Sequence, residues 1–256
     1  EATMAGLVGD FEQAAEGLVA RTLDGEIPQS ELYPLLAECF RAKLGGDGFL
    51  QTFLWIVPPD DAGLLDEVLR EPDLHRRMRC LEALGNREED ALAPFFLKAV
   101  HDPIIDVGQL AMRHLGKLPS AFPMLLAQLE SGQPDQVRTA LNTFGENREP
   151  RAAEPILHLI QGEIRDDLMV EAVEALTQIR VPRSAPVLLA QLHDGKPLNL
   201  QLALARALGE LAVPEASLGL LQKSVQLKHP EVLILALEGA GFDVLWWAII
   251  SDSLGG

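Results

Sequence analysis

The chain has 256 residues, of which 48% are hydrophobic but only 5% are aromatic, so aliphatic side chains must build its core. Its 38 Asp and Glu residues outnumber its 21 Lys and Arg residues and give a formal net charge of -17. Nucleic acids and anionic membranes are held largely by Lys and Arg, so this charge argues against both as partners.

The first 60 residues predict helices that do not follow the pattern of the later sequence. Apolar residues at helical spacing predict a helix over residues 2–23. A second helix is predicted over residues 30–44, and a short apolar helix over residues 49–57 is stopped by two prolines. We therefore expect residues 1–60 to form an irregular helical cap that shields the open apolar face of the first repeat.

From residue 61 onward, an apolar residue followed by glycine, or once by threonine, recurs every 29 to 32 residues. The recurring pairs are Leu84-Gly85, Leu115-Gly116, Phe144-Gly145, Leu176-Thr177, Leu208-Gly209 and Ala240-Gly241. We expect the glycine to follow a helix in left-handed backbone conformation, which glycine adopts most easily. The recurrence predicts about six helix pairs over residues 61–242, and a last helix, cap or truncated repeat over residues 243–256.

Each predicted pair has two distinguishable helices. The first has a proline near its start, where the backbone N-H has no acceptor within the helix, as at Pro94, Pro123, Pro155 and Pro186. The second carries a mostly small residue five positions before the recurring glycine, namely Cys80, Ala111, Ala140, Ala172, Leu204 and Ala236. Small side chains let neighbouring helices approach closely. The sequence therefore predicts an all-α fold, an α-solenoid of antiparallel helix pairs.

Three positions before the glycine, the second helices carry a polar residue in every repeat: Glu82, Arg113, Asn142, Glu174, Arg206 and Glu238. One interpretation is a ladder of solvated or paired side chains, each exposed pair contributing about 0–1 kcal/mol. The other is that these residues line a concave face where a partner docks. The two interpretations are compatible.

The repeats resemble a known family. Asp102-Pro103 with Val107, Ala111 and Leu115-Gly116 resembles a HEAT repeat of the bacterial kind noted in phycobilisome lyases, and residues 133–145 and 229–232 are similar. An arginine that often follows the valine is present as Arg138, but Gly108 and Leu233 take its place in two other repeats. The landmarks of tetratricopeptide and ankyrin repeats are missing.

Because a solenoid presents an extended inner surface, our leading hypothesis is a non-enzymatic scaffold or adaptor that binds another protein along the concave face and needs no cofactor. The residues we expect to bind the partner are Gln109, Arg113, Arg138, Asn142, Glu174 and Arg206. The lyase resemblance implies an alternative, an enzyme or chaperone that holds a bilin or a client protein. A HEAT-like DNA glycosylase is a third possibility, but it would need a basic groove.

The remaining motifs favour structural roles. The six histidines include no HxxxH pair, so we expect no metal site, and no phosphate-binding loop or nucleophile motif is present. Arg76, Arg77 and Arg79 form the densest basic cluster, which we interpret as a solvated or ion-paired helix face. Trp246 and Trp247 are expected to complete the core of the last repeat or to pack on a following helix, the alternative being an exposed binding site.

Cysteine usage and hydropathy bear on location. Cys39 and Cys80 have no CxxC partner, which favours a reducing compartment, and no signal peptide or apolar run of spanning length is present. We therefore expect a cytoplasmic protein. Because the sequence starts with Glu and an apolar run lies near its end, we expect it to be a fragment of a longer chain.

Overall fold

A computed structural model describes residues 4–162, 164–227, 229–236 and 238. All regular elements among these residues are helices, and none is a strand, which confirms the all-α prediction. The contacts divide the chain into two compact units, Glu1–Ala121 and Phe122–Gly256, called unit 1 and unit 2 below. The division predicted from sequence, into residues 1–60, 61–242 and 243–256, stays a prediction.

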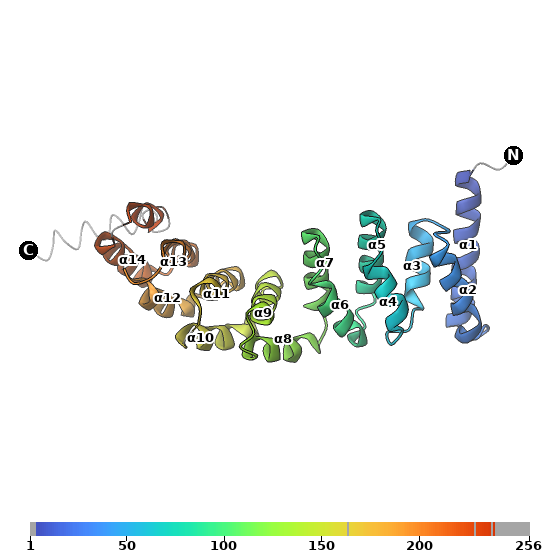
Figure 1. The fold of residues 1–256 in the computed structure, drawn as a ribbon, viewed down its shortest axis with the longest axis horizontal. Helices are drawn as coiled ribbons and strands as arrows, with labels where there is room; N and C mark the ends of the chain where they lie inside the picture. The colour runs from blue at the N-terminus through green and yellow to red at the C-terminus, as the bar shows by residue number, and fades with distance from the viewer. Residues whose placement is uncertain (1–3, 163, 228, 237, 239–256) are drawn as a thin grey trace, which may run out of the picture. The chain divides into compact units, whose positions relative to one another are not determined.

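Unit 1 begins with a long helix and continues as helix pairs (Figure 1). Its helices are α1 (Met4–Leu23), α2 (Gln29–Arg41), α3 (Asp47–Trp55), α4 (Ala62–Leu69), α5 (Leu74–Gly85), η1 (Asp90–Leu92), α6 (Ala93–Ala99) and α7 (Ile105–Leu115). The prolines behave as predicted, because Pro94 lies in the first turn of α6 and Pro58 and Pro59 follow α3.

Unit 2 repeats the same alternation (Figure 1). Its helices are α8 (Ala121–Glu130), α9 (Pro134–Glu146), η2 (Pro150–Ala152), α10 (Ala153–Gln161), α11 (Asp166–Ile179), η3 (Pro182–Ser184), α12 (Ala185–Gln191), α13 (Leu198–Leu211) and α14 (Pro214–Gln226). Short 3-10 turns precede α10 and α12, and no sequence pattern predicted them.

The helices pack in sequence order within each unit. We call the first helix of a pair the A helix (α2, α4, α6, α8, α10, α12 and α14) and the second the B helix (α3, α5, α7, α9, α11 and α13). In unit 1, α3 packs on α5 and α5 on α7, and in unit 2, α9 packs on α11 and α11 on α13. Each unit is therefore a stack of helix pairs, which is the arrangement of an α-solenoid.

The mostly small residues five positions before the recurring glycine or threonine are buried. Cys80 and Ala111 in unit 1 and Ala140, Ala172 and Leu204 in unit 2 all have 0% of their surface exposed. These side chains therefore belong to the cores of their units.

The expected role of the recurring glycine was wrong. Gly85 and Gly145 lie inside α5 and α9, and Gly116 has right-handed helical backbone with φ -64°. In four repeats the left-handed residue comes three positions after the recurring glycine or threonine and is not glycine: Glu88, Arg148, Arg180 and Ala212 have φ of 49°, 49°, 58° and 50°.

Instead, the glycine permits close packing between B helices. A Cβ atom added to Gly85 would lie 2.1 Å from Nδ1 of His114 on α7, and one added to Gly145 would lie 3.2 Å from Cα of Ala175 on α11. Both distances are shorter than ordinary van der Waals contact. At Gly85 and Gly145, the glycine is therefore required by the neighbouring helix and not by a turn.

The arginine cluster of α5 is ion-paired, as expected. Arg76 pairs with Glu71 at 3.3 Å, Arg77 with Asp102 at 2.7 Å and Arg79 with Asp47 at 3.3 Å. The guanidinium of Arg76 also lies 5.0 Å from the centre of the Phe40 ring. These arginines join α5 to its neighbours in unit 1 and do not form a free basic patch.

Candidate functional site

Helix periodicity predicts that the polar residues three positions before the recurring glycine or threonine face solvent. A residue two positions after a buried one is turned about 200° around the helix axis, so it faces away from the packed side. Arg113, Asn142, Glu174 and Arg206 follow Ala111, Ala140, Ala172 and Leu204 at this spacing, and all four are exposed. Gln109 is exposed as well, whereas Arg138 is half-buried.

The six candidate residues fall in different units. Gln109 and Arg113 lie on α7 in unit 1. Arg138 and Asn142 lie on α9, Glu174 on α11 and Arg206 on α13, all in unit 2. The four residues of unit 2 are therefore carried by three B helices that pack on one another in order.

Glu174 and Arg206 line one groove between α11 and α13, called the α11–α13 groove below. It has a volume of about 370 Å³, and its apolar side chains include Val170, Val173 and Leu202. Glu210 joins the two charged candidates in its lining. Among the residues that the structure describes, neither Glu174 nor Arg206 makes an ion pair or a side-chain hydrogen bond, so both charges are available to a ligand.

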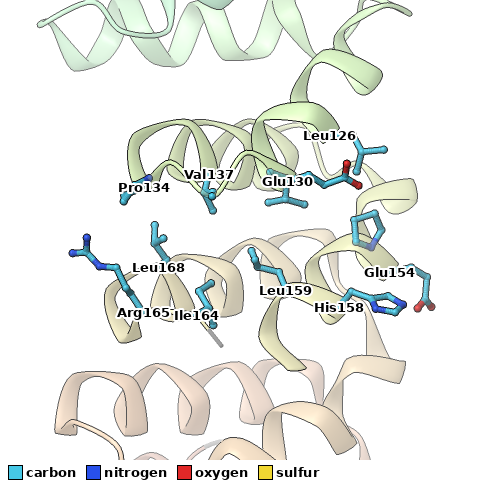
Figure 2. Close-up of a pocket in the computed structure, with 13 residues that line it drawn as sticks. Leu126, Glu130, Pro134, Val137, Glu154, His158, Leu159, Ile164, Arg165 and Leu168 are labelled. Carbon is cyan, nitrogen blue, oxygen red and sulfur yellow. The ribbon is translucent and has the colours of Figure 1, made fainter. Parts of the chain in front are cut away.

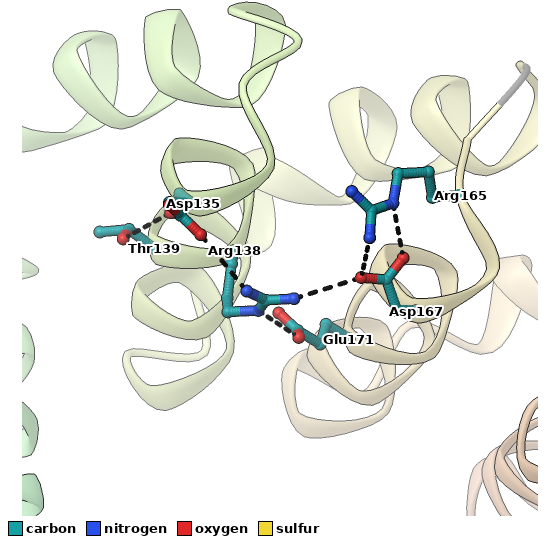
Figure 3. A network of polar contacts seen from close by, with 6 residues as sticks. All are labelled: Asp135, Arg138, Thr139, Arg165, Asp167 and Glu171. Atoms are coloured by element: carbon teal, nitrogen blue, oxygen red, sulfur yellow. Dashed lines mark hydrogen bonds and ion pairs between the residues drawn. The ribbon is translucent and has the colours of Figure 1, made fainter.

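Arg138 has a different environment, at the contact between α9 and α11 (Figure 3). Its Nε donates to Glu171 at 2.6 Å, and its other nitrogens lie 3.4 Å from Asp167 and 3.5 Å from Asp135. The hydrogen bond to the Glu171 carboxylate raises the pKa of Arg138 above its ordinary value. Asp167 in turn accepts two hydrogen bonds from Arg165. Arg138 therefore joins two neighbouring repeats.

A second and larger cavity lies in unit 2, and the sequence did not predict it. It has a volume of about 690 Å³ and lies between the α8–α9 pair and the α10–α11 pair, with Leu126, Glu130, Leu159 and Arg165 among its lining residues (Figure 2). No sequence signal marks these residues, because their pattern is the same apolar and polar alternation found in the other A helices.

Two features of the described chain bear on other kinds of site. Among the described residues, no group of three or more His, Cys, Asp and Glu side chains is arranged to hold a metal ion. In the same part of the chain, no helix combines the length and apolar character needed to cross a membrane. Trp246 and Trp247 lie outside the described residues.

A comparison with known protein families agrees with the repeat architecture. Residues 122–209 match a family model described as HEAT repeats. A solved structure, the complex of CpcE and CpcF of phycocyanin lyase from Nostoc sp. PCC7120, is similar at 21% identity, with a TM-score of 0.40 over 72% of this chain and 76% of that chain. The search of curated proteins found no match. The matched segment runs from α8 into α13, and residues 122–209 of this chain are therefore HEAT repeats.

Proposed function

We propose that this chain is a protein-interaction scaffold whose B helices in unit 2 bind a partner protein. The observation that carries this proposal is the α11–α13 groove, where an apolar floor adjoins the exposed charges of Glu174 and Arg206. Protein interfaces combine an apolar centre with polar groups at the rim, and stacked helical repeats commonly present such surfaces.

The charges of this face favour a protein over a nucleic acid. Arg206 shares the groove with Glu174 and Glu210, and Arg138 is occupied by carboxylates. A phosphate backbone needs several free cations along one surface. A protein surface can instead present one charge of each sign in register with Arg206 and Glu174.

Charge reversal at the groove tests the proposal. Affinity purification of the wild-type chain and of Arg206→Glu from the native host, followed by quantitative mass spectrometry, should show the partner reduced in the variant. Because Arg206 is exposed and unpaired, the melting temperature should stay within the range of ordinary surface substitutions.

Arg148→Glu is the matched control, since Arg148 is exposed, lies after α9 and is not part of the groove. This control should retain the partner. Retention of every co-purifying protein at the wild-type level in Arg206→Glu would show that the groove is not the binding site.

The two alternatives implied by the resemblance have their own tests. A bilin-binding protein would produce a visible absorbance band when the purified chain is mixed with a linear tetrapyrrole. A glycosylase would shift damaged duplex DNA in a gel at low salt. Neither result is expected for a protein-interaction scaffold.

A further inference from the structure

In the described part of the chain, side-chain hydrogen bonds connect the neighbouring A helices of unit 2 in two of three cases. Nζ of Lys223 donates to the carbonyl oxygens of Leu189 and Leu192 at 2.7 and 3.1 Å, and so joins α14 to the end of α12. Nε2 of Gln191 donates to the carbonyl oxygen of Ile160 at 3.4 Å and joins α12 to α10. Between α8 and α10, no hydrogen bond or ion pair is present among the described residues.

The cavity opens between these two helices, which no hydrogen bond or ion pair of the described residues connects, and we call it the α8–α10 groove (Figure 2). Near the start of the two helices, the guanidinium of Arg151 in η2, just before α10, lies 4.3 Å from the centre of the Phe122 ring on α8. Beyond that contact, the half-buried side chains of Leu126 on α8 and Leu159 on α10 line the groove. The groove therefore presents apolar surface that neither helix covers.

The charge that is left free at this groove is negative. Arg165 is neutralised by Asp167, which accepts hydrogen bonds of 3.0 and 2.9 Å from it. Glu154 pairs with Arg183 at 3.0 Å. Glu130, however, is exposed and has no partner among the described residues. It also lies at the C-terminal end of α8, where the helix dipole favours a cation.

We propose that the α8–α10 groove binds an amphipathic, basic helical segment of a partner protein. Apolar side chains on one face of that segment would contact Leu126 and Leu159, and a neighbouring Lys or Arg would pair with Glu130. Grooves between helices bind such segments through apolar residues three and four positions apart. A second copy of this chain fits poorly, because each copy carries a formal charge of -17 and would be repelled.

This site is independent of the α11–α13 groove. The α8–α10 groove is lined by A helices and by the beginnings of α9 and α11, and it shares no lining residue with the other groove. Arg206→Glu should therefore leave binding at the α8–α10 groove unchanged, so that the failure of one proposal can be separated from the failure of the other.

A fluorescein-labelled peptide tests the proposal on the full chain. The probe is a short helical peptide of Leu and Lys with Leu at positions three and four apart, and its binding is measured by fluorescence anisotropy at physiological salt. The wild-type chain should bind it saturably. Glu130→Lys should weaken binding by about three- to tenfold, because an attraction becomes a repulsion. Glu146→Lys makes the same change at an exposed residue at the end of α9 and should leave the affinity within about twofold.

Leucine substitutions test the apolar part of the groove. Leu159→Ser should weaken binding by about fivefold or more, because a partly covered apolar contact is lost. Leu218→Ser, at an exposed leucine on α14, should have little effect. Circular dichroism checks that both variants are folded.

Several outcomes would overturn the proposal. These are no saturable binding by the wild-type chain, equal weakening by Glu130→Lys and Glu146→Lys, and equal binding of a peptide with the same composition in scrambled order. A dimer detected by light scattering and dissociated by Glu130→Lys would assign the groove to a second copy instead.

Discussion

His114 is a buried titratable residue between α5 and α7 in unit 1. Only 7% of its surface is exposed, its ring lies 5.5 Å from the centre of the Phe96 ring, and its Nδ1 has no hydrogen-bond partner. Burial lowers the pKa of the imidazole below its ordinary value, and the positive charges of Lys117 and Arg113 lower it further. The folded chain therefore holds His114 neutral where the unfolded chain would protonate it.

This pKa shift makes the stability depend on pH. The folded pKa lies below the unfolded value of about 6.5, so the unfolded chain binds the extra proton as the pH falls through this range. The stability linked to His114 is fully present above pH 6.5 and is lost as the pH falls toward the folded pKa. Thermal unfolding at pH 7.5 and 5.5 should therefore show a smaller loss of stability for His114→Gln than for the wild type.

His101→Gln is the control for this measurement, because His101 is exposed. It should lose as much stability as the wild-type chain between the two pH values. An identical loss in His114→Gln would show that His114 does not contribute to the pH dependence.

At the scale of the element, the glycine of a B helix sets how closely the next B helix approaches. Gly85→Ala places a methyl group against the ring of the buried His114. We expect this change to lower the free energy of unfolding by about 1–3 kcal/mol, measured by chemical denaturation. Combining it with His114→Ala should recover part of the loss, because the two side chains then no longer overlap.

Gly17→Ala should have the opposite effect in the same unit. Gly17 lies inside α1, is exposed, and an added Cβ would have no atom within 4 Å. Alanine is the better helix former, so this change should stabilise the chain by about 0.5–1 kcal/mol. A loss of stability in Gly17→Ala comparable to that in Gly85→Ala would contradict the packing role assigned to Gly85.

The elements that depend on local periodicity could be predicted from the sequence. The burial of Ala140 and the exposure of Asn142 both follow from helical spacing within α9. The role of Gly145 could not be predicted, because a glycine near a helix end serves a turn or a close contact equally well. The structure distinguishes the two through the neighbouring residue Ala175.

The candidate sites were predictable to different degrees. Glu174 and Arg206 were singled out by their repeated position, but the groove that joins them depends on the spacing of α11 and α13. The α8–α10 groove lies between the two neighbouring A helices of unit 2 that no side-chain hydrogen bond connects in the part of the chain that the structure describes. Lys223 bridges one joint by reaching carbonyl oxygens more than 30 residues away in sequence, and no local pattern reveals such a contact.

At the scale of the whole molecule, one arrangement of the B helices is repeated in both units. In α5, α7, α9, α11 and α13, the residue five positions before the recurring glycine or threonine is buried, and from α7 to α13 the polar residue two positions later is exposed. Stability in such a stack comes mainly from contacts between neighbouring repeats. Every repeat should therefore respond alike to the same pair of substitutions, wherever it lies along the chain.

A tryptophan scan of paired positions tests this arrangement most directly, with the free energy of unfolding measured for each variant. Ala111→Trp in unit 1 and Ala140→Trp and Ala172→Trp in unit 2 should each destabilise the chain by about 1–3 kcal/mol or more, because these sites are fully buried. Their exposed neighbours, changed as Arg113→Trp, Asn142→Trp and Glu174→Trp, should stay within about 0.5 kcal/mol of the wild type. Equal effects at buried and exposed positions, or a reversed order in either unit, would contradict the stacking of B helices and remove the face proposed to bind a partner.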